Sequence, residues 1–346
     1  MIEQTVYNQD LNTLIKEGVV HEKNTQHYFG HGKLLLSGEY FVLDGAKALA
    51  LPTKVGQSMT VKYSQSFDPI LYWKSYDVNG KLWLEAKFEF WHFDCLDENP
   101  KQEVLLLQKI LRQARKQNSH FLRDEVDVLV ETFLGFPLEW GLGSSSTLIY
   151  NIAQWAYISP FELLFKTYGG SGYDIACAQS EGPIVYHKNS TGPNWSPVSF
   201  HPSFRENLYF VYLGQKQNTG KAIEYYNTMR PFDPELILNL STITDDLMKA
   251  KSLEEFEFLL EAHERIIAEN LKMETVKESR FPDYWGIVKS LGAWGGDFVM
   301  VTSNKSLEET CAYFESNGHS IVIPYDEIIL AGSEEEADVT NNEYLQ

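Results

Sequence analysis

The sequence has few cysteines, and the three that it has, Cys95, Cys177 and Cys311, are widely spaced and form no Cys-x-x-Cys pair. This spacing argues against a disulfide framework and against a zinc site built from thiolates, and it is typical of proteins kept in a reducing compartment. We therefore expect a cytoplasmic protein in which each cysteine is a small buried hydrophobic residue.

Long apolar runs are also lacking. No stretch approaches the roughly 18 consecutive apolar residues that a membrane-spanning helix needs. Residues 1–10, MIEQTVYNQD, contain neither a basic start nor an apolar centre, so we do not expect a secretory signal. These features predict that the protein has no membrane partner.

Positive charge is scarce as well. The chain contains 29 Lys and Arg residues but 48 Asp and Glu residues, which gives a net charge of −19. Binding of duplex nucleic acid depends on Lys and Arg side chains that neutralise phosphates, so we expect no nucleic-acid partner. With 43% hydrophobic and 14% aromatic residues, the 346-residue chain has enough apolar surface for a folded core, which excludes a disordered protein.

The pattern of apolar residues mixes strand and helix signals. Alternation in residues 81–93 predicts an antiparallel strand with one solvated face, and residues 102–117 carry apolar side chains at helical spacing. Further strands are expected at 33–36, 59–63, 126–133, 207–213, 297–302 and 320–324, and two helices within 234–273. Because helices are grouped rather than alternating with strands, the sequence predicts the α+β class.

The chain divides into four expected parts. Residues 1–26 form an N-terminal extension, 27–198 a first domain, 199–330 a second domain, and 331–346 an acidic tail. Turn-forming residues at 191–193 mark the boundary between the two domains. The tail contains clustered like charges without apolar partners, so we expect it to be solvated and disordered.

The segment most informative about function is residues 136–150, FPLEWGLGSSSTLIY. Glycine lets a backbone approach a ligand closely, and the first N–H groups of a helix suit a phosphate. Hydroxyl groups at the same end can add hydrogen bonds or reach a magnesium ion. The segment is neither a Walker A loop nor a dinucleotide fingerprint. The alternative is an ordinary serine-capped helix after a glycine turn. The residues of this candidate phosphate loop are Gly141, Leu142, Gly143, Ser144, Ser145 and Ser146.

Three other segments contain residues of possible chemical use. In residues 169–178, GGSGYDIACA, Asp174 follows a glycine stretch at the start of a helix, either as a base or as a charge that complements the helix dipole. In residues 31–40, HGKLLLSGEY, Lys33 opens an apolar strand and Glu39 follows a Ser-Gly turn. Residues 289–297, KSLGAWGGD, form a glycine-rich turn before a strand. Taken singly, each is explained by ordinary structure.

Together and in this order, HGKLLLSGEY, GLGSSST, GSGYDIACA and GAWGGD resemble four segments of the GHMP kinases. This superfamily includes galactokinase, homoserine kinase, mevalonate kinase and phosphomevalonate kinase. Its segments read Pro-Gly-Lys…Gly-Glu-His/Tyr, GLGSSA, Ser-Gly-x-Asp and GAGGG. The resemblance spans about residues 28–330 and is closest to the phosphomevalonate kinase branch. Residues 172–176, GYDIA, are also similar to the signature of a bacterial subgroup linked to the mevalonate pathway.

The resemblance implies a two-lobed fold with mixed and antiparallel sheets, an active site between the lobes, and ATP binding by residues 27–198. It implies a kinase that uses ATP and Mg²⁺ to phosphorylate a small molecule, mevalonate or phosphomevalonate, in isoprenoid precursor synthesis. The alternatives are a catalytically weak nucleotide-binding sensor of the same fold, a sugar or amino-alcohol kinase, and diphosphomevalonate decarboxylase. The oligomeric state is not predicted.

The resemblance also implies roles for single residues. Asp174 would accept the proton of the attacking hydroxyl, and Lys33 would stabilise the charged Asp174 or the developing alkoxide. The phosphate loop would hold the ATP phosphates, with Ser145 or Ser146 touching magnesium. The remaining residues implied to contact substrate or phosphate are Glu39, Ser171, Gly172, Gly292, Gly295 and Gly296. Residues 214–221 resemble a substrate-side loop that contains Lys216 and Thr219.

The sequence departs from the family pattern in three places. His31 replaces the usual Pro, while Leu291 and Trp294 replace the usual Thr and Gly, and an indole there is large enough to reshape the substrate pocket. Asp174 follows Ser146 by only 28 positions, fewer than in the family. That shortened region often supplies an acidic magnesium ligand, for which Glu162 is the nearest candidate. The identity of the substrate and of this ligand is therefore left open.

Overall fold

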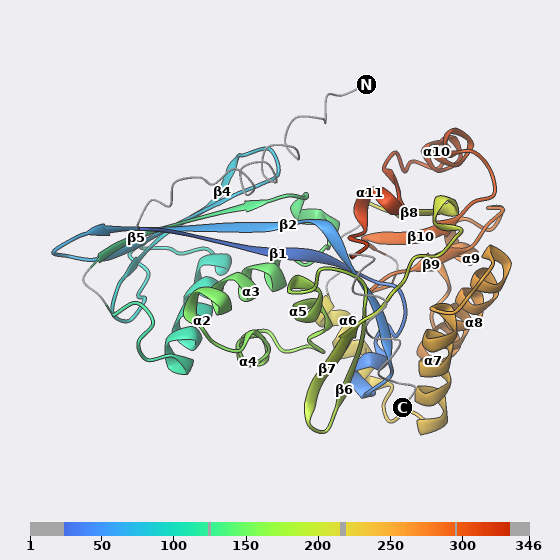
Figure 1. Cartoon of the computed structure of the whole chain (residues 1–346), viewed down its shortest axis with the longest axis horizontal. Coiled ribbons are helices and arrows are strands. Elements are labelled where there is room, and N and C mark those ends of the chain that lie inside the picture. Colours follow the sequence, from blue (N-terminus) through green and yellow to red (C-terminus); the bar gives the residue numbers. More distant parts are fainter. Residues whose placement is uncertain (1–23, 124–125, 215–218, 295, 333–346) are drawn as a thin grey trace.

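The computed structural model describes residues 24–332 apart from 124–125, 215–218 and 295. Most of the expected N-terminal extension and of the acidic tail therefore lies outside the described residues, and strand β1 begins at Thr25. The described elements form two sheets, each with its own group of helices (Figure 1). This arrangement confirms the predicted α+β class.

The first sheet has seven strands in the order β4-β3-β5-β2-β6-β7, with β1 paired to β2. Only the β3–β5 pair is parallel, so the sheet is mixed, as expected. Its strands are β1 (Thr25–Leu35), β2 (Ala48–Gln65), β3 (Ile70–Tyr76), β4 (Leu82–Glu89), β5 (Val126–Leu134), β6 (Ile184–Asn189) and β7 (Gly192–Pro197).

One face of the first sheet is covered by helices α2 (Gln102–Gln117), α3 (Ser144–Ala156), α4 (Pro160–Thr167) and α5 (Tyr173–Ala178) (Figure 1). Buried and less buried residues alternate along β5, so every second side chain of this strand points into the core. The apolar face of α2 supplies the opposite side of that core, as its helical spacing predicts.

The second sheet has four antiparallel strands in the order β11-β8-β10-β9. They are β8 (Leu208–Tyr212), β9 (Val288–Ser290), β10 (Phe298–Thr302) and β11 (Val322–Pro324). Every residue of β10 is buried, which explains why this strand reads as a continuous apolar run rather than an alternating one. A hydrophobic cluster that includes Leu34, Leu51, Phe210 and Met300 joins the two sheets.

The helices of the second half are α6 (Thr219–Thr228), α7 (Pro234–Leu247), α8 (Leu253–Leu271), α9 (Val276–Arg280), α10 (Leu307–Ser316) and α11 (Tyr325–Ile328). Short 3-10 helices are η1 (Phe41–Asp44), η2 (Leu138–Trp140) and η3 (Arg205–Asn207). The two helices predicted within 234–273 are α7 and α8. Their break lies where the Ser252 hydroxyl accepts the N–H of Glu255 and so caps α8.

Some expectations need correction. The strand predicted over 81–93 ends at Glu89, because the Glu89 carboxylate accepts the N–H groups of Trp91 and His92 and folds the chain into a turn. Of the three free cysteines only Cys177 is buried, so the expectation that all three are core residues was wrong. Strand β3 and the β6–β7 hairpin were not anticipated.

Among the residues that the structure describes, no helix has the length and apolar character required to cross a membrane.

A buried ionic cluster joins the two halves of the chain. Lys289 of β9 contacts Glu39, which lies between β1 and η1, and its Nζ is 3.1 Å from Glu264 Oε2 on α8. The neighbouring His263 accepts the N–H of Gly38 at 2.9 Å through Nε2. Lys289, both carboxylates and His263 are all buried. The cluster therefore fixes the turn that follows β1 to the second sheet.

Two carboxylates share one ammonium in this cluster, so one carboxylate is left without full compensation. Burial raises the pKa of Glu39 to about 7, although Lys289 opposes this rise. Burial also lowers the pKa of His263 well below its usual value, and the adjacent Lys289 lowers it further. His263 is therefore neutral, which agrees with its role as a hydrogen-bond acceptor.

We predict that Glu39→Ala strongly destabilises the protein, because it deprives the buried Lys289 of a partner. Removing one member of a buried ion pair costs about 3–5 kcal/mol of unfolding free energy. The control is Asp245→Ala, which breaks the 2.6 Å Lys47–Asp245 pair, whose side chains are 41% and 32% exposed. That loss should be about 0–1 kcal/mol. Urea unfolding measures both, and equal losses would contradict the prediction.

Candidate active site

The candidate phosphate loop, residues 141–146, connects η2 to the start of α3. Gly141 and Gly143 have φ angles of 66° and 94°, in the left-handed region that glycine adopts without strain. A β-carbon on Gly141 would overlap the Asp297 carboxylate, and one on Gly143 would lie 3.2 Å from Lys33 Cγ. Both positions therefore need glycine because other segments approach the backbone there.

Helix α3 begins within this loop, at Ser144. Its N-cap is Gly143, so no side chain caps the helix, and the alternative of a serine-capped helix is not what the structure shows. The first N–H groups of a helix lack partners inside the helix and lie at the positive end of its dipole. Ser145 is exposed at this end and Ser146 is buried. The loop thus presents backbone donors beside the exposed residue Ser145, whose side chain is hydrogen-bonded to Tyr168.

Lys33 lies on β1 against this loop. Its N–H donates to the carbonyl of Leu142 at 3.0 Å, and its ammonium lies 5.8 Å from the centroid of the Tyr173 ring. Burial lowers the pKa of Lys33, but Tyr173, Asp174 and Asp297 outweigh burial and raise the pKa above its ordinary value. Lys33 is therefore a cation at neutral pH, and its charge interacts with two carboxylates.

Asp174 lies in the first turn of α5, after Gly172 with a φ of 100°. One carboxylate oxygen, Oδ1, accepts the N–H of Ile175 at 3.1 Å, and the other, Oδ2, accepts the hydroxyl of Ser146. The predicted neighbours Asp174, Lys33 and Ser146 are thus brought together, although they come from three separate segments. Ser146 was predicted to touch magnesium, and in this structure its hydroxyl orients Asp174.

Asp297 was not recognised as a site residue from the sequence. It follows the glycine turn directly and precedes β10, and its Oδ2 lies against the backbone of Gly141. It also acts electrostatically on Lys33. The GAWGGD segment, through Asp297, therefore approaches both Gly141 and Lys33. The available signal was that Asp297 is the one charged residue of GAWGGD.

Other predicted residues lie around this centre. Ser171 and Gly172 are buried, and the hydroxyl of Tyr186 donates to the carbonyl of Ser171 at 2.5 Å. Gly292 has a φ of 62°, and Gly296 is buried. These residues shape the turns that precede Asp174 and Asp297.

Four predicted residues are not placed at this centre. Gly295 and Lys216 lie outside the described residues. Glu39 is fully buried beside Lys289, so its carboxylate belongs to the ionic cluster and does not face the phosphate loop. Thr219 is described only as the first residue of α6.

Glu162, the candidate magnesium ligand, is exposed on α4. Its carboxylate pairs with Lys166 one helical turn later, which is an ordinary solvated pair. Within the described part of the chain, no contact joins Glu162 to Lys33 or Asp174. The structure therefore gives no geometric support to this candidate.

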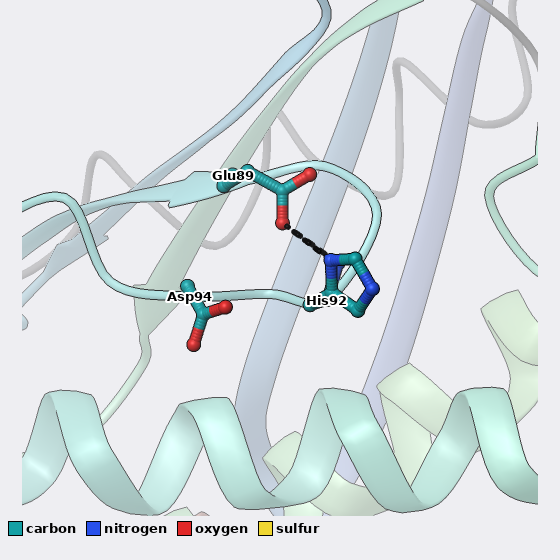
Figure 2. Close-up of side chains that lie close together, drawn as sticks. All are labelled: Glu89, His92 and Asp94. Atoms are coloured by element: carbon teal, nitrogen blue, oxygen red, sulfur yellow. Dashed lines mark hydrogen bonds and ion pairs between the residues drawn. The ribbon is translucent and has the colours of Figure 1, made fainter.

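A second group of metal-type side chains, Glu89, His92 and Asp94, lies near the end of β4 (Figure 2). The Glu89 carboxylate accepts two backbone N–H groups and contacts His92, and Asp94 pairs with Arg112 at 2.5 Å. His92 and Asp94 are exposed. The hydrogen bonds and ion pairs of Glu89 and Asp94 with the protein explain why these side chains lie together. We therefore assign the group to the turn that follows β4 and not to a metal site.

Trp294, which departs from the family pattern, is buried beside the glycine turn. Its backbone N–H donates to the hydroxyl of Tyr40 at 3.2 Å, and its ring packs in a cluster with Phe41 and Tyr226. Tyr40 and Tyr226 stack with their ring centroids 5.6 Å apart. The indole thus joins an aromatic wall that connects the turn after β1 to helix α6.

Comparison with known proteins gives no match to a protein-family model and none to a curated protein sequence. Solved structures do match. The mevalonate kinase of L. major in complex with R-mevalonate has a TM-score of 0.59 and 16% identity, covering 82% of this chain and 89% of its own.

Two further solved structures bind different ligands. The Streptococcus pneumoniae phosphomevalonate kinase in complex with phosphomevalonate and AMPPNP has a TM-score of 0.60 and 17% identity, covering 85% of this chain and 97% of its own. The Lactococcus lactis galactokinase complexed with galactose has a TM-score of 0.56 and 13% identity, covering 89% of this chain and 92% of its own. The shared feature is the fold, which does not decide among these substrates.

We predict that Gly141→Ala destabilises the protein more than Gly169→Ala. Both glycines have positive φ, which costs an alanine about 1–2 kcal/mol, but space around Gly169 is open while Gly141 faces Asp297. The overlap should add about 1–3 kcal/mol for Gly141→Ala. Urea unfolding of the two variants tests this, and equal midpoints would show that Asp297 does not press on the loop.

Proposed function

We propose that this chain, which has the fold of the GHMP kinases, is an ATP- and Mg²⁺-dependent kinase that phosphorylates mevalonate or phosphomevalonate. The observation that carries the proposal is the contact of Asp174 with Ser146 beside the Lys33 ammonium, at the glycine loop that opens α3. A carboxylate, a cation and backbone donors are the groups that phosphoryl transfer requires.

The proposed reaction assigns a step to each group. The backbone of the phosphate loop binds the ATP phosphates, and Asp174 Oδ2 accepts the proton of the acceptor hydroxyl as its oxygen bonds to the γ-phosphorus. The bond from the γ-phosphorus to the bridging oxygen breaks, and ADP leaves. Lys33 stabilises the negative charge that develops on the acceptor oxygen. Ser146 holds Asp174 in position through its hydroxyl.

The site also fits a magnesium ion. Mg²⁺ prefers hard oxygen donors, and the loop offers the hydroxyl of the exposed residue Ser145 and the hydroxyl of Ser146 beside a carboxylate. The ion would neutralise charge on the phosphates. Because Glu162 is paired with Lys166 on an exposed helix, it is the weaker of the candidates that the sequence offered.

The choice of substrate rests on resemblance. The GYDIA segment is similar to that of a subgroup linked to the mevalonate pathway, and solved structures of this fold hold R-mevalonate or phosphomevalonate. Trp294 favours a second candidate, a nucleotide-binding sensor with weak catalysis, since its indole fills space beside the glycine turn. The cytoplasmic location stays a prediction.

We predict a single added phosphoryl group when the purified protein is incubated with Mg·ATP and either mevalonate or phosphomevalonate, measured by product mass. Diphosphomevalonate and galactose serve as comparison substrates. Release of carbon dioxide from diphosphomevalonate would identify a decarboxylase instead, and phosphorylated galactose a sugar kinase. Tight ATP binding without turnover of any acceptor would favour the sensor.

We predict that Asp174→Asn lowers kcat about 10²- to 10⁴-fold, because the amide cannot accept the proton of the acceptor hydroxyl. The affinity for Mg·ATP, measured by calorimetry, should remain because the loop backbone is unchanged. Asp245→Asn, which alters a partly exposed carboxylate paired with Lys47, is the matched control and should keep full activity. Turnover of Asp174→Asn at the wild-type rate would remove Asp174 from the reaction.

A further inference from the structure

We propose that Glu39 carries a proton in the folded protein, and that loss of this proton weakens the connection between the two halves of the chain. The site is the buried cluster of Glu39, Lys289, Glu264 and His263, in which two carboxylates share one ammonium. The inference concerns the contact between the halves rather than phosphoryl transfer, so it is independent of the proposed function.

The charges of this cluster do not balance when both carboxylates are ionised. Within the described part of the chain, Lys289 is the one Lys or Arg that pairs with Glu39 or Glu264. Its ammonium also donates to the carbonyl of Ser290 at 2.6 Å, so no ammonium hydrogen is left over. Both carboxylates are buried, and an uncompensated charge away from water is costly. One added proton makes the cluster neutral.

The donors around the two carboxylates indicate which of them takes the proton. Glu264 Oε1 accepts the N–H of Ser290 at 3.0 Å, and its Oε2 lies beside the ammonium, so both of its oxygens face a donor. Glu39 Oε1 faces the same ammonium, but its Oε2 has no hydrogen-bond partner among the described residues. Donors stabilise the ionised form of a carboxyl group. Glu39 is therefore the carboxylate that gains more from a proton.

Glu39 Oε2 also faces an atom that accepts hydrogen bonds. His263 Nε2 lies 3.6 Å from it and accepts the backbone N–H of Gly38 at 2.9 Å. A ring nitrogen that accepts carries no hydrogen of its own, so two acceptor atoms face each other. A proton on Oε2 lies between them and removes the repulsion. Burial raises the pKa of Glu39 to about 7, in agreement with this placement.

The groups that act on Glu39 come from β9, from α8 and from its own turn. Ionised Glu264 favours the protonated form of Glu39, and Lys289 opposes it. His263 is neutral, and burial raises the pKa of Tyr40, which stays uncharged. Folding thus raises the pKa of Glu39 above its ordinary 4.5, and the folded chain holds a proton that the unfolded chain releases. The stability that this proton contributes is complete below pH 4.5 and is lost as the pH rises through about 7.

The test is urea unfolding of the wild type and of Glu39→Gln at pH 6 and at pH 8. The amide keeps an oxygen for the Lys289 ammonium and has no proton to lose. The folding equilibrium constant of the wild type should fall about 10-fold between the two pH values, beyond any change in Glu39→Gln. Asp245→Asn, at a partly exposed carboxylate paired with Lys47, should keep the wild-type dependence. An equal pH dependence in Glu39→Gln and the wild type would overturn the inference.

A measurement on the native wild type covers the case in which Glu39→Gln does not fold. In infrared spectra a protonated carboxylic acid has a C=O band that a carboxylate lacks. This band should be present at pH 6, where exposed carboxylates are ionised, and should disappear with a midpoint near pH 7. Its absence at pH 6 would also overturn the inference. Glu264→Gln removes the neighbouring negative charge, so it should move the midpoint to lower pH, and an unchanged midpoint would contradict the charge balance.

Discussion

The arrangement of the candidate site depends on one ammonium group. Lys33 interacts with Asp174 from the first half of the chain and with Asp297 from the second, and its backbone N–H donates to Leu142 of the candidate phosphate loop. Both carboxylates therefore act on the same cation, whose side chain lies against Gly143. The close approach of the four segments is therefore an electrostatic balance as well as a packing arrangement, and both glycines leave the space that it needs.

A second constraint holds the two halves of the chain together around the candidate site. The turn that follows β1 is tied to β9 by Glu39 and Lys289, which are 250 positions apart in sequence. The turn continues into Tyr40, whose hydroxyl accepts a hydrogen bond from the backbone N–H of Trp294. The glycine turn before Asp297 is thus attached at both ends to the first half of the chain: through Lys289 before it and through the Asp297–Gly141 contact after it.

Sequence reasoning selected those parts of the candidate site that short motifs encode, and their roles stay predictions. The glycine loop, Asp174 and Lys33 were recognised because their residue types and order are unusual, and the amphipathic pattern located α2, α7 and α8. Asp297 and the burial of Glu39 were missed, because each depends on a partner far away in the chain and resembles an ordinary strand or turn residue locally. Glu162 was selected by sequence position alone, and its side chain is paired on an exposed helix.

The burial of the Glu39–Lys289 pair has a consequence for how the two halves respond to dissolved ions. Mobile ions screen charges that are open to solvent, with a Debye length of about 8 Å at physiological ionic strength, but they screen buried pairs much less. Surface pairs such as Lys62 with Glu131 therefore weaken as salt is added, while the connection between β9 and the turn after β1 keeps its strength. The strength of this contact between the two halves should therefore depend little on the salt concentration of the solution.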